Sequence, residues 1–155
     1  MKNRTCCFTG HRNLNSNTTL LKQKLKLQII ELIKDGYIYF GAGGARGFDT
    51  IAAKTILELK SIYPKIKLIL VLPCLNQTKG WNKKDIIAFE ALKRKADKIK
   101  LLSKNYYDGC MQARNRHLVN NSSVCLCYLE KSYGGTFYTV AYAKRNGLKI
   151  INLAD

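Results

Sequence analysis

Short β-prone runs alternate with helical patterns along the whole of this 155-residue chain, and the alternation restricts the folds open to it. The clearest run, "KLILVLP" at residues 67–73, is apolar throughout after its first lysine. Such a run is typical of a parallel strand that is covered on both faces. The pattern predicts an α/β protein with three layers, a mainly parallel sheet and right-handed crossovers.

Hydrophobic periodicity, glycine and proline set the expected elements. The expected strands cover residues 5–10, 37–42, 67–73, 98–103, 124–129 and 149–153. The expected helices cover residues 18–34, 48–63, 85–96, 111–120 and 136–146. Because no repeat, low-complexity segment or interdomain linker occurs, we expect residues 1–155 to form a single domain with a sheet of about six strands.

Composition excludes several classes of protein. A content of 46% apolar residues with two prolines argues against disorder. No apolar run approaches the ~20 residues of a membrane span, and the N-terminus becomes polar too early for a signal peptide. We therefore expect a soluble, cytoplasmic protein with no membrane partner. The six cysteines form no CxxC pair, which argues against a metal site and favours buried, reduced thiols.

The chain carries 27 basic and 10 acidic residues, a formal net charge of +17. This excess favours anionic partners such as nucleotides and nucleic acid. Much of it is lysine spaced along expected helices, as in "LLKQKLKLQ" and "EALKRKADKIK", where it also suits a solvated helix face. The charge therefore indicates an anionic ligand and leaves nucleic acid open as a partner.

Glycines, hydroxyls and cations gather in four loops that each follow an expected strand. Ligands of parallel sheets bind at the carboxyl ends of the strands, near a switch in strand order. We therefore expect these loops to form one binding site. Its candidate residues are Thr9, Gly10, His11, Arg12, Gly43, Gly44, Ala45, Arg46, Gly47, Pro73, Gln77, Gly134, Gly135 and Thr136.

The chemistry of these loops indicates a phosphate. A helix N-terminus offers unpaired N–H groups and the positive end of a dipole, glycine lets a ligand approach closely, and Arg46 adds a charge-assisted fork. Two loops open onto expected helices, the first glycine loop (residues 43–47) and the second glycine loop (residues 134–136). A ligand with two phosphates, or with phosphate and ribose, fits this pattern. Close helix–strand packing is the alternative reason for the glycines of the first loop.

Further candidates lie beside these loops. Asp49, in the first turn of its helix, either compensates the helix dipole or contacts the ligand. Arg114 and Arg116 point to different sides of their helix, so we expect one of them to face the ligand, and the spacing does not choose between them. Gln77 and Trp81 are candidates for contact with a base or ribose.

Known nucleotide-binding fingerprints are absent. The sequence has no GxGxxG, because the sixth position counted from Gly41 is Arg46. It has no GxxxxGK[ST] loop and no GxSxG elbow either. ATP hydrolysis of the Walker type is therefore not expected.

Five segments nevertheless resemble a known family when taken in order: "CCFTGHR", "GGARGFDTIAA", "LPCLNQTKGW", "MQARNRHLV" and "YGGTFYTVAYA". They are similar to the YpsA-like branch of the SLOG superfamily, which also contains the LOG phosphoribohydrolases and the DNA-processing DprA proteins. The resemblance implies a Rossmann-like fold and a nucleotide-type pocket built by the glycine loops. It implies a nucleotide, a signalling nucleotide or an ADP-ribose-type molecule as ligand, and a homo-oligomer.

Two departures from these relatives shape the functional expectation. In LOG enzymes the second glycine loop reads PGGxGTxxE, and the alignment places Tyr138 and Thr139 at the two acidic positions. Without that glutamate we expect a binding protein with no catalytic residue and no required cofactor, and LOG-like hydrolysis assisted by Asp49 is the alternative. "GGARGFDTIAA" is similar to the DprA loop SGxARGxDxxAH, with Arg46 at the DNA-contacting arginine, although the last histidine of that loop is missing, since Ala53 is followed by Lys54. Single-stranded DNA binding is therefore a further alternative.

Overall fold

The computed structural model describes residues 1–14 and 18–155 as a six-stranded parallel sheet in the order β4-β3-β2-β1-β5-β6. The strands are β1 (Thr5–Gly10), β2 (Tyr39–Ala42), β3 (Lys67–Leu72), β4 (Lys98–Leu101), β5 (Val124–Tyr128) and β6 (Lys149–Asn152). The described α-helices are α1 (Thr18–Lys34), α2 (Phe48–Lys60), α3 (Lys83–Lys95), α4 (Cys110–Asn120) and α5 (Gly135–Arg145). The expected α/β, Rossmann-like architecture is confirmed.

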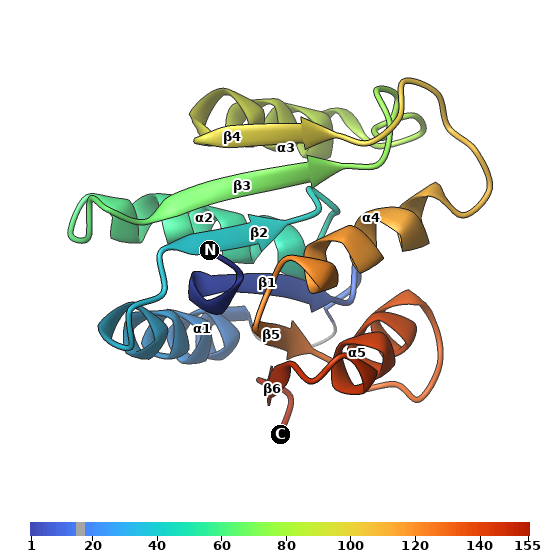
Figure 1. Ribbon diagram of the computed structural model, residues 1–155. Coiled ribbons are helices and arrows are strands. Elements are labelled where there is room, and N and C mark those ends of the chain that lie inside the picture. The colour runs from blue at the N-terminus through green and yellow to red at the C-terminus, as the bar shows by residue number, and fades with distance from the viewer. Residues whose placement is uncertain (15–17) are drawn as a thin grey trace.

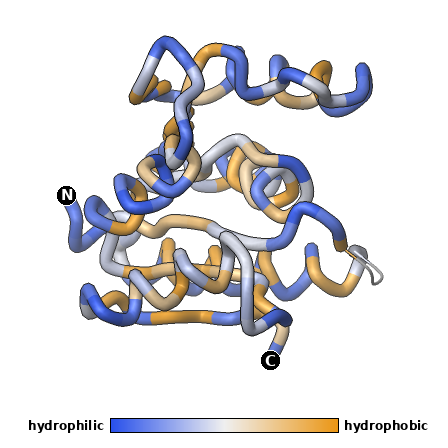
Figure 2. Tube along the Cα trace, turned by 90° about the vertical axis from the view of Figure 1, so that its right-hand side faces the viewer, coloured by the Kyte–Doolittle hydropathy of each residue, from blue (hydrophilic) through white to orange (hydrophobic). Residues whose placement is uncertain are grey.

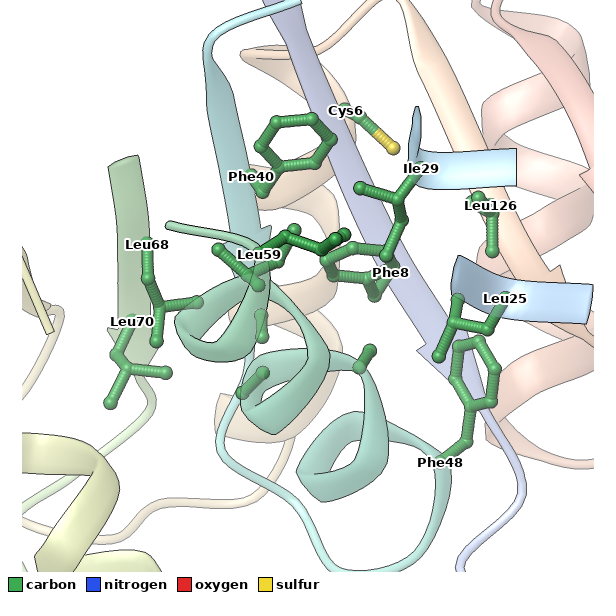
Figure 3. Close-up of a cluster of buried hydrophobic side chains, with 14 of the residues drawn as sticks. Cys6, Phe8, Leu25, Ile29, Phe40, Phe48, Leu59, Leu68, Leu70 and Leu126 are labelled. Atoms are coloured by element: carbon green, nitrogen blue, oxygen red, sulfur yellow. The ribbon is translucent and has the colours of Figure 1, made fainter. Parts of the chain in front are cut away.

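The larger part of the core lies on the face of the sheet that is covered by α1, α2 and α3. In α1 the buried residues Leu21, Leu25, Ile29 and Leu32 recur at a spacing of three or four, which forms one apolar stripe. Figure 3 shows two of them beside the rings of Phe8, Phe40 and Phe48. Because Phe8 and Phe40 come from neighbouring strands, with ring centroids 6.2 Å apart, this core fixes the strands relative to the helices.

A smaller core on the opposite face is covered by α4 and α5, which lie in front of the sheet in Figure 1. It contains Val119 of α4, Val140 of α5 and three strand thiols, Cys7, Cys125 and Cys127. All six cysteines of the chain are free and buried, in agreement with the expectation of reduced thiols. The end of α4 and the middle of α5 are therefore packed against this face of the sheet.

Some element boundaries differ from the expected ones. Strand β2 begins at Tyr39 rather than at residue 37, because the Tyr37 amide donates to Leu32 O and completes the C-terminal turn of α1. Helix α3 begins at Lys83 rather than at residue 85, because the Asn82 side chain accepts a hydrogen bond from the Asp85 amide. The remaining differences are of one to three residues, at element ends.

The strand order reverses between β1 and β5. From β1 the chain builds outward through β2, β3 and β4, and β5 and β6 then add to the other side of β1. All strands point the same way, so the loops after β1 and β5 emerge side by side at the carboxyl edge, on the right in Figure 1. Ligands of open α/β sheets bind at such a switch point.

Candidate functional site

The main cavity, of about 510 Å³, opens at the switch point of the sheet. Figure 2 views the molecule from this carboxyl edge. The cavity is formed by the loops after β1 and β5 and by the beginnings of α2, α4 and α5. It is lined by the candidates Thr9, Gly10, His11, Arg12, Ala45, Asp49, Arg114, Gly134, Gly135 and Thr136.

A second cavity, of about 420 Å³, adjoins the main one and is called the Trp81 cavity below. Arg46, Gln77 and Trp81 line it from the first glycine loop and the loop after β3. Arg12 and Arg114 belong to the walls of both cavities, so the two cavities meet at these cations.

The remaining candidates lie outside both cavities. Gly43, Gly44, Gly47 and Pro73 line neither of them. Arg116 lies instead in a groove between α4 and α5, beside Tyr138 and Thr139.

Tight packing accounts for the three glycines of the first loop that line no cavity. A Cβ atom on Gly43 would lie 2.5 Å from Arg114 Nη1, and one on Gly44 would lie 2.8 Å from Phe89 Cε1. At Gly47, which has φ of 77°, a Cβ atom would lie 2.3 Å from Arg12 O. The structure thus supports the packing alternative for these glycines, with Ala45 and Arg46 left at the cavity walls.

Three helices begin at the main cavity with glycine as the N-cap residue: Gly47 before α2, Gly109 before α4 and Gly134 before α5. None of these caps supplies a side chain that accepts from the first backbone N–H groups. The first turns of α4 and α5 also contain no acidic residue. The positive ends of the α4 and α5 dipoles therefore face a common space, whereas the start of α2 is already compensated by Asp49 and its first N–H, of Phe48, donates to His11 O.

The Gly43 carbonyl oxygen is the centre of a buried hydrogen-bond network. It accepts from Gln77 Nε2 at 3.0 Å and from Arg114 Nη1 at 2.5 Å. Arg114, which is 4% exposed, also donates from Nε to Asn115 Oδ1 at 2.8 Å. Nη2 has only a weak contact with the Met111 sulfur, at 3.9 Å. Arg114 is thus held at the junction of the two cavities, whereas Arg116 lines neither of them.

Asp49 is the one carboxylate among the described residues that line the main cavity. Its Oδ2 accepts from the Gly43 amide at 3.3 Å, so it holds the first glycine loop against α2. Burial raises the pKa of Asp49 to about 6, although Arg114 and two backbone N–H groups oppose the shift. Burial also lowers the pKa of Arg114, but a guanidinium retains its charge at neutral pH.

His11 joins the two loops at the switch point. Its Nε2 accepts a hydrogen bond of 2.9 Å from the Glu130 amide, so the other ring nitrogen carries the proton of the neutral form. Burial lowers the pKa of His11, and the charge of Lys131 lowers it further. The imidazole is therefore neutral at pH 7 and contributes shape and hydrogen bonding to the cavity rather than charge.

Several residues of the main cavity were not among the sequence candidates, in particular Gly109, Gln112 and Lys131. Lys131 lies three residues before the second glycine loop, and a lysine so close to a glycine loop is a sequence feature that could have identified it as a candidate. Gly109 comes from a loop with no motif of its own, and Gln112 lies in the segment "MQARNRHLV", where it carries no charge that would single it out. In the described part of the chain, no group of His, Cys, Asp or Glu is arranged to hold a metal, and no helix is both long and apolar enough to cross a membrane.

Structures of DNA processing protein A have a similar fold. The protein of Streptococcus pneumoniae superposes with a TM-score of 0.68 at 16% identity, over 97% of this chain and 50% of that one. The protein of Helicobacter pylori, studied for its single-stranded DNA binding mode, gives 0.64 at 22% identity, over 96% and 64%. The chain thus spans half of the first protein and less than two thirds of the second, and at these identities the likeness shows the fold alone.

Sequence comparison places the chain in a family. It is 29% identical over 139 residues to the UPF0398 protein BH1768 of Halalkalibacterium halodurans, over 88% of this chain and 71% of that protein. The model of the YspA SLOG family, named YpsA, matches residues 6–150. The resemblance to the YpsA-like branch is therefore confirmed, and this chain belongs to the YspA SLOG family.

Proposed function

We propose that this protein binds a nucleotide or a nucleotide-derived ligand, with its phosphate in the main cavity. One observation carries the proposal: helices α4 and α5, which begin at glycine caps and have no acidic residue in their first turns, open on the same cavity, together with the cations Arg12, Arg114 and Lys131. Helix N-termini and fixed guanidinium groups are the partners that proteins use for phosphate.

The second glycine loop is the preferred phosphate position within the main cavity. No atom would lie within 4 Å of a Cβ atom on Gly134 or Gly135, so the backbone there is open to a ligand. The first turn of α5 has no acidic side chain that would compete for its N–H groups. Arg114 Nη2, which lacks a strong partner among the described residues, supplies a charged donor from α4 at the same cavity.

The proposal is binding rather than hydrolysis. Tyr138 and Thr139 replace the acidic residues of LOG enzymes and line the groove between α4 and α5, not the main cavity. Asp49 remains as a carboxylate, but its Oδ2 is occupied by the Gly43 amide. This bond gives Asp49 a structural role in the first glycine loop that accounts for its position without catalysis.

A thermal-shift screen tests the proposal, with AMP, ADP, ATP, GTP, NAD and ADP-ribose at one moderate salt concentration. A ligand at 100 times its Kd stabilises the folded state by about 2.7 kcal/mol, which the screen detects. Arg12→Gln, an exposed side chain at both cavities, is expected to abolish the shift. Arg116→Gln is the matched control outside them. The absence of any shift, or an equal loss in both variants, would contradict the proposal.

Single-stranded DNA binding is a second candidate function, and one surface feature favours it. The groove between α4 and α5 contains Arg116, Arg145 and Tyr142, and it meets the main cavity at Gln112 and Asn115. Cations beside aromatic rings suit a nucleic-acid strand, and the net charge of +17 adds to the attraction.

Fluorescence anisotropy with a labelled oligonucleotide distinguishes the two functions. DNA binding predicts an affinity that falls linearly with the logarithm of salt concentration, because each neutralised phosphate releases counterions. It also predicts a weaker slope in the double variant Arg116→Gln, Arg145→Gln, which lies outside the main cavity. A response to free nucleotides alone, unchanged in that variant, favours the first function.

A further inference from the structure

We propose that the ligand is a dinucleotide-type molecule, with two nucleoside-sized halves joined through phosphate, and that its second ring lies on Trp81. This inference rests on the proposed function and narrows it to one class of ligand. The site consists of two adjoining cavities of about 510 and 420 Å³. Each volume lies within the range of ~300–1,000 Å³ that is typical of small-molecule sites, so each cavity has room for one half of such a ligand.

The charges of the site lie where a dinucleotide carries its phosphates. Arg12 and Arg114 are the cations that line both cavities, so they stand at the middle of any ligand that spans the two. Arg114 is fixed there by its bonds to Gly43 and Asn115. A mononucleotide has its phosphate at one end and fills only one side of this junction.

Trp81 gives the second cavity a flat aromatic wall. Its ring is held edge-on by Phe89, with centroids 5.6 Å apart. The Arg46 guanidinium covers it, 5.1 Å from the ring centroid, and makes no hydrogen bond to another described residue. A nucleobase stacks on the same kind of surface, so it can replace the guanidinium on Trp81. Arg46 is then free to turn toward the phosphates.

The hydrogen bonding of the Gln77 side chain indicates which polar group the second ring carries. Its side chain is 6% exposed, and the bond from Nε2 to Gly43 O fixes which way the amide faces. Gln77 Oε1 and Arg46 Nε are buried without a partner among the described residues. Buried polar atoms are nearly always paired, so these two unpaired atoms at one cavity require an explanation.

A ligand that donates a hydrogen bond to Gln77 Oε1 supplies that explanation. Both unpaired atoms are closed off from solvent, so the wall must open before Oε1 is reached. Arg46 can make this opening by leaving the Trp81 ring. Among the described residues, its guanidinium is held only by the cation–π contact with that ring. The ring that enters therefore carries an exocyclic amino group, as adenine, cytosine and guanine do.

Calorimetric titration of the intact chain with ADP and with diadenosine diphosphate tests the number of rings, because both probes carry two phosphates. We expect diadenosine diphosphate to bind at least 10-fold more tightly. In Trp81→Ala that preference should disappear, while the Kd for ADP changes less than twofold. Tyr107→Ala is the matched control, an exposed aromatic residue outside both cavities.

A ligand-side experiment tests the amino group without altering the protein. Diinosine diphosphate presents a carbonyl where adenine presents its amine, so an acceptor would face Gln77 Oε1. We expect its affinity to fall at least 10-fold below that of diadenosine diphosphate, by more than the ratio between ADP and IDP, which reports the first ring.

The outcomes separate this inference from the proposed function. Equal affinity for ADP and diadenosine diphosphate overturns the dinucleotide inference and leaves nucleotide binding intact. No binding of either probe overturns both. A short oligonucleotide that binds more tightly than diadenosine diphosphate, with an affinity unchanged in Trp81→Ala, overturns the inference in favour of DNA.

Discussion

The two glycine loops look alike in the sequence and differ in the tertiary structure. In the first loop, the space beside Gly43, Gly44 and Gly47 is filled by other parts of the protein. In the second loop, the space beside Gly134 and Gly135 is open. Both loops precede a helix N-terminus at the same cavity, so the glycine pattern by itself does not separate a packed loop from one that is open to a ligand.

The loops also differ in what meets their backbone N–H groups. Helix α2 carries Asp49 in its first turn, and this carboxylate accepts hydrogen bonds from the Gly43 and Ala45 amides. Helix α5 has no acidic residue in its first turn. The N–H groups of the first loop therefore bind a carboxylate of the protein itself, that of Asp49. The N–H groups at the start of α5 have no such carboxylate and are open to an anionic ligand.

The largest expected effect comes from adding a methyl group at Gly47, the N-cap residue that ends the first loop. The same change at Gly134, the N-cap residue of the second loop, is the comparison. Gly47→Ala places a Cβ atom against the backbone oxygens of Arg12 and His11, and it imposes a positive φ on alanine. We expect a loss of more than about 4 kcal/mol of unfolding free energy, which urea titration measures. Gly134→Ala meets no neighbour and retains only backbone strain, about 1–3 kcal/mol. Equal losses would remove the distinction between the loops.

Asp49 makes the stability of the first loop depend on pH. The folded-state pKa is about 6 and the ordinary value is 3.8, so as pH rises the unfolded chain loses this proton first. Ionisation of Asp49 should therefore lower the unfolding free energy of the wild type by about 3 kcal/mol as pH rises from below 4 to 7. The folded-state and ordinary pKa values differ by about two units, and each unit corresponds to about 1.4 kcal/mol.

Asp49→Asn cannot ionise and is expected to lack this loss. The difference in unfolding free energy between Asp49→Asn and wild type should therefore move in favour of the variant by about 3 kcal/mol between about pH 3 and pH 7. Urea titrations at several pH values measure it. A difference that is constant with pH would show that the carboxyl group ionises as easily in the folded protein as in the unfolded chain.

Gly43→Ala is expected to act on the ligand site through Arg114. The new Cβ atom would lie within 2.8 Å of three guanidinium atoms, so the head group has to move from the junction of the cavities. Overpacking of this kind costs about 1–3 kcal/mol of stability. We also expect nucleotide affinity to fall about 10-fold, as titration calorimetry would record. Retention of full affinity would exclude Arg114 from the phosphate position.

Gly135→Ala has the smallest expected effect and the opposite sign. The site has open space and an ordinary φ, and it begins helix α5. Replacing glycine by alanine at a compatible position stabilises a protein by about 0.4–1 kcal/mol, chiefly through the unfolded chain. Thermal unfolding measures this gain. A loss of stability would mean that the second loop is packed after all.

Local patterns in the sequence were sufficient to predict the elements. Buried strands appear as apolar runs, and amphipathic helices repeat their apolar residues every three or four positions, as Leu21, Leu25 and Ile29 do in α1. Once the strands are parallel, their following loops must meet at one edge, and this places Thr9 and Gly134 at the same cavity. The position of the main cavity was therefore predictable from the sequence, since it depends on strand direction and loop order.

The choice among the candidate residues was made by contacts between distant parts of the chain. Arg114 faces the cavities because its guanidinium bonds to Gly43 O, 71 residues away in sequence, and Arg116 points to another groove. The same contact fills the space beside Gly43 and helps to close the first glycine loop. The sequence by itself determined which segments form the carboxyl edge, because periodicity and turn chemistry are local. Only the tertiary structure decided which glycines and which arginine face the cavity, because that depends on how helices from separate segments pack together.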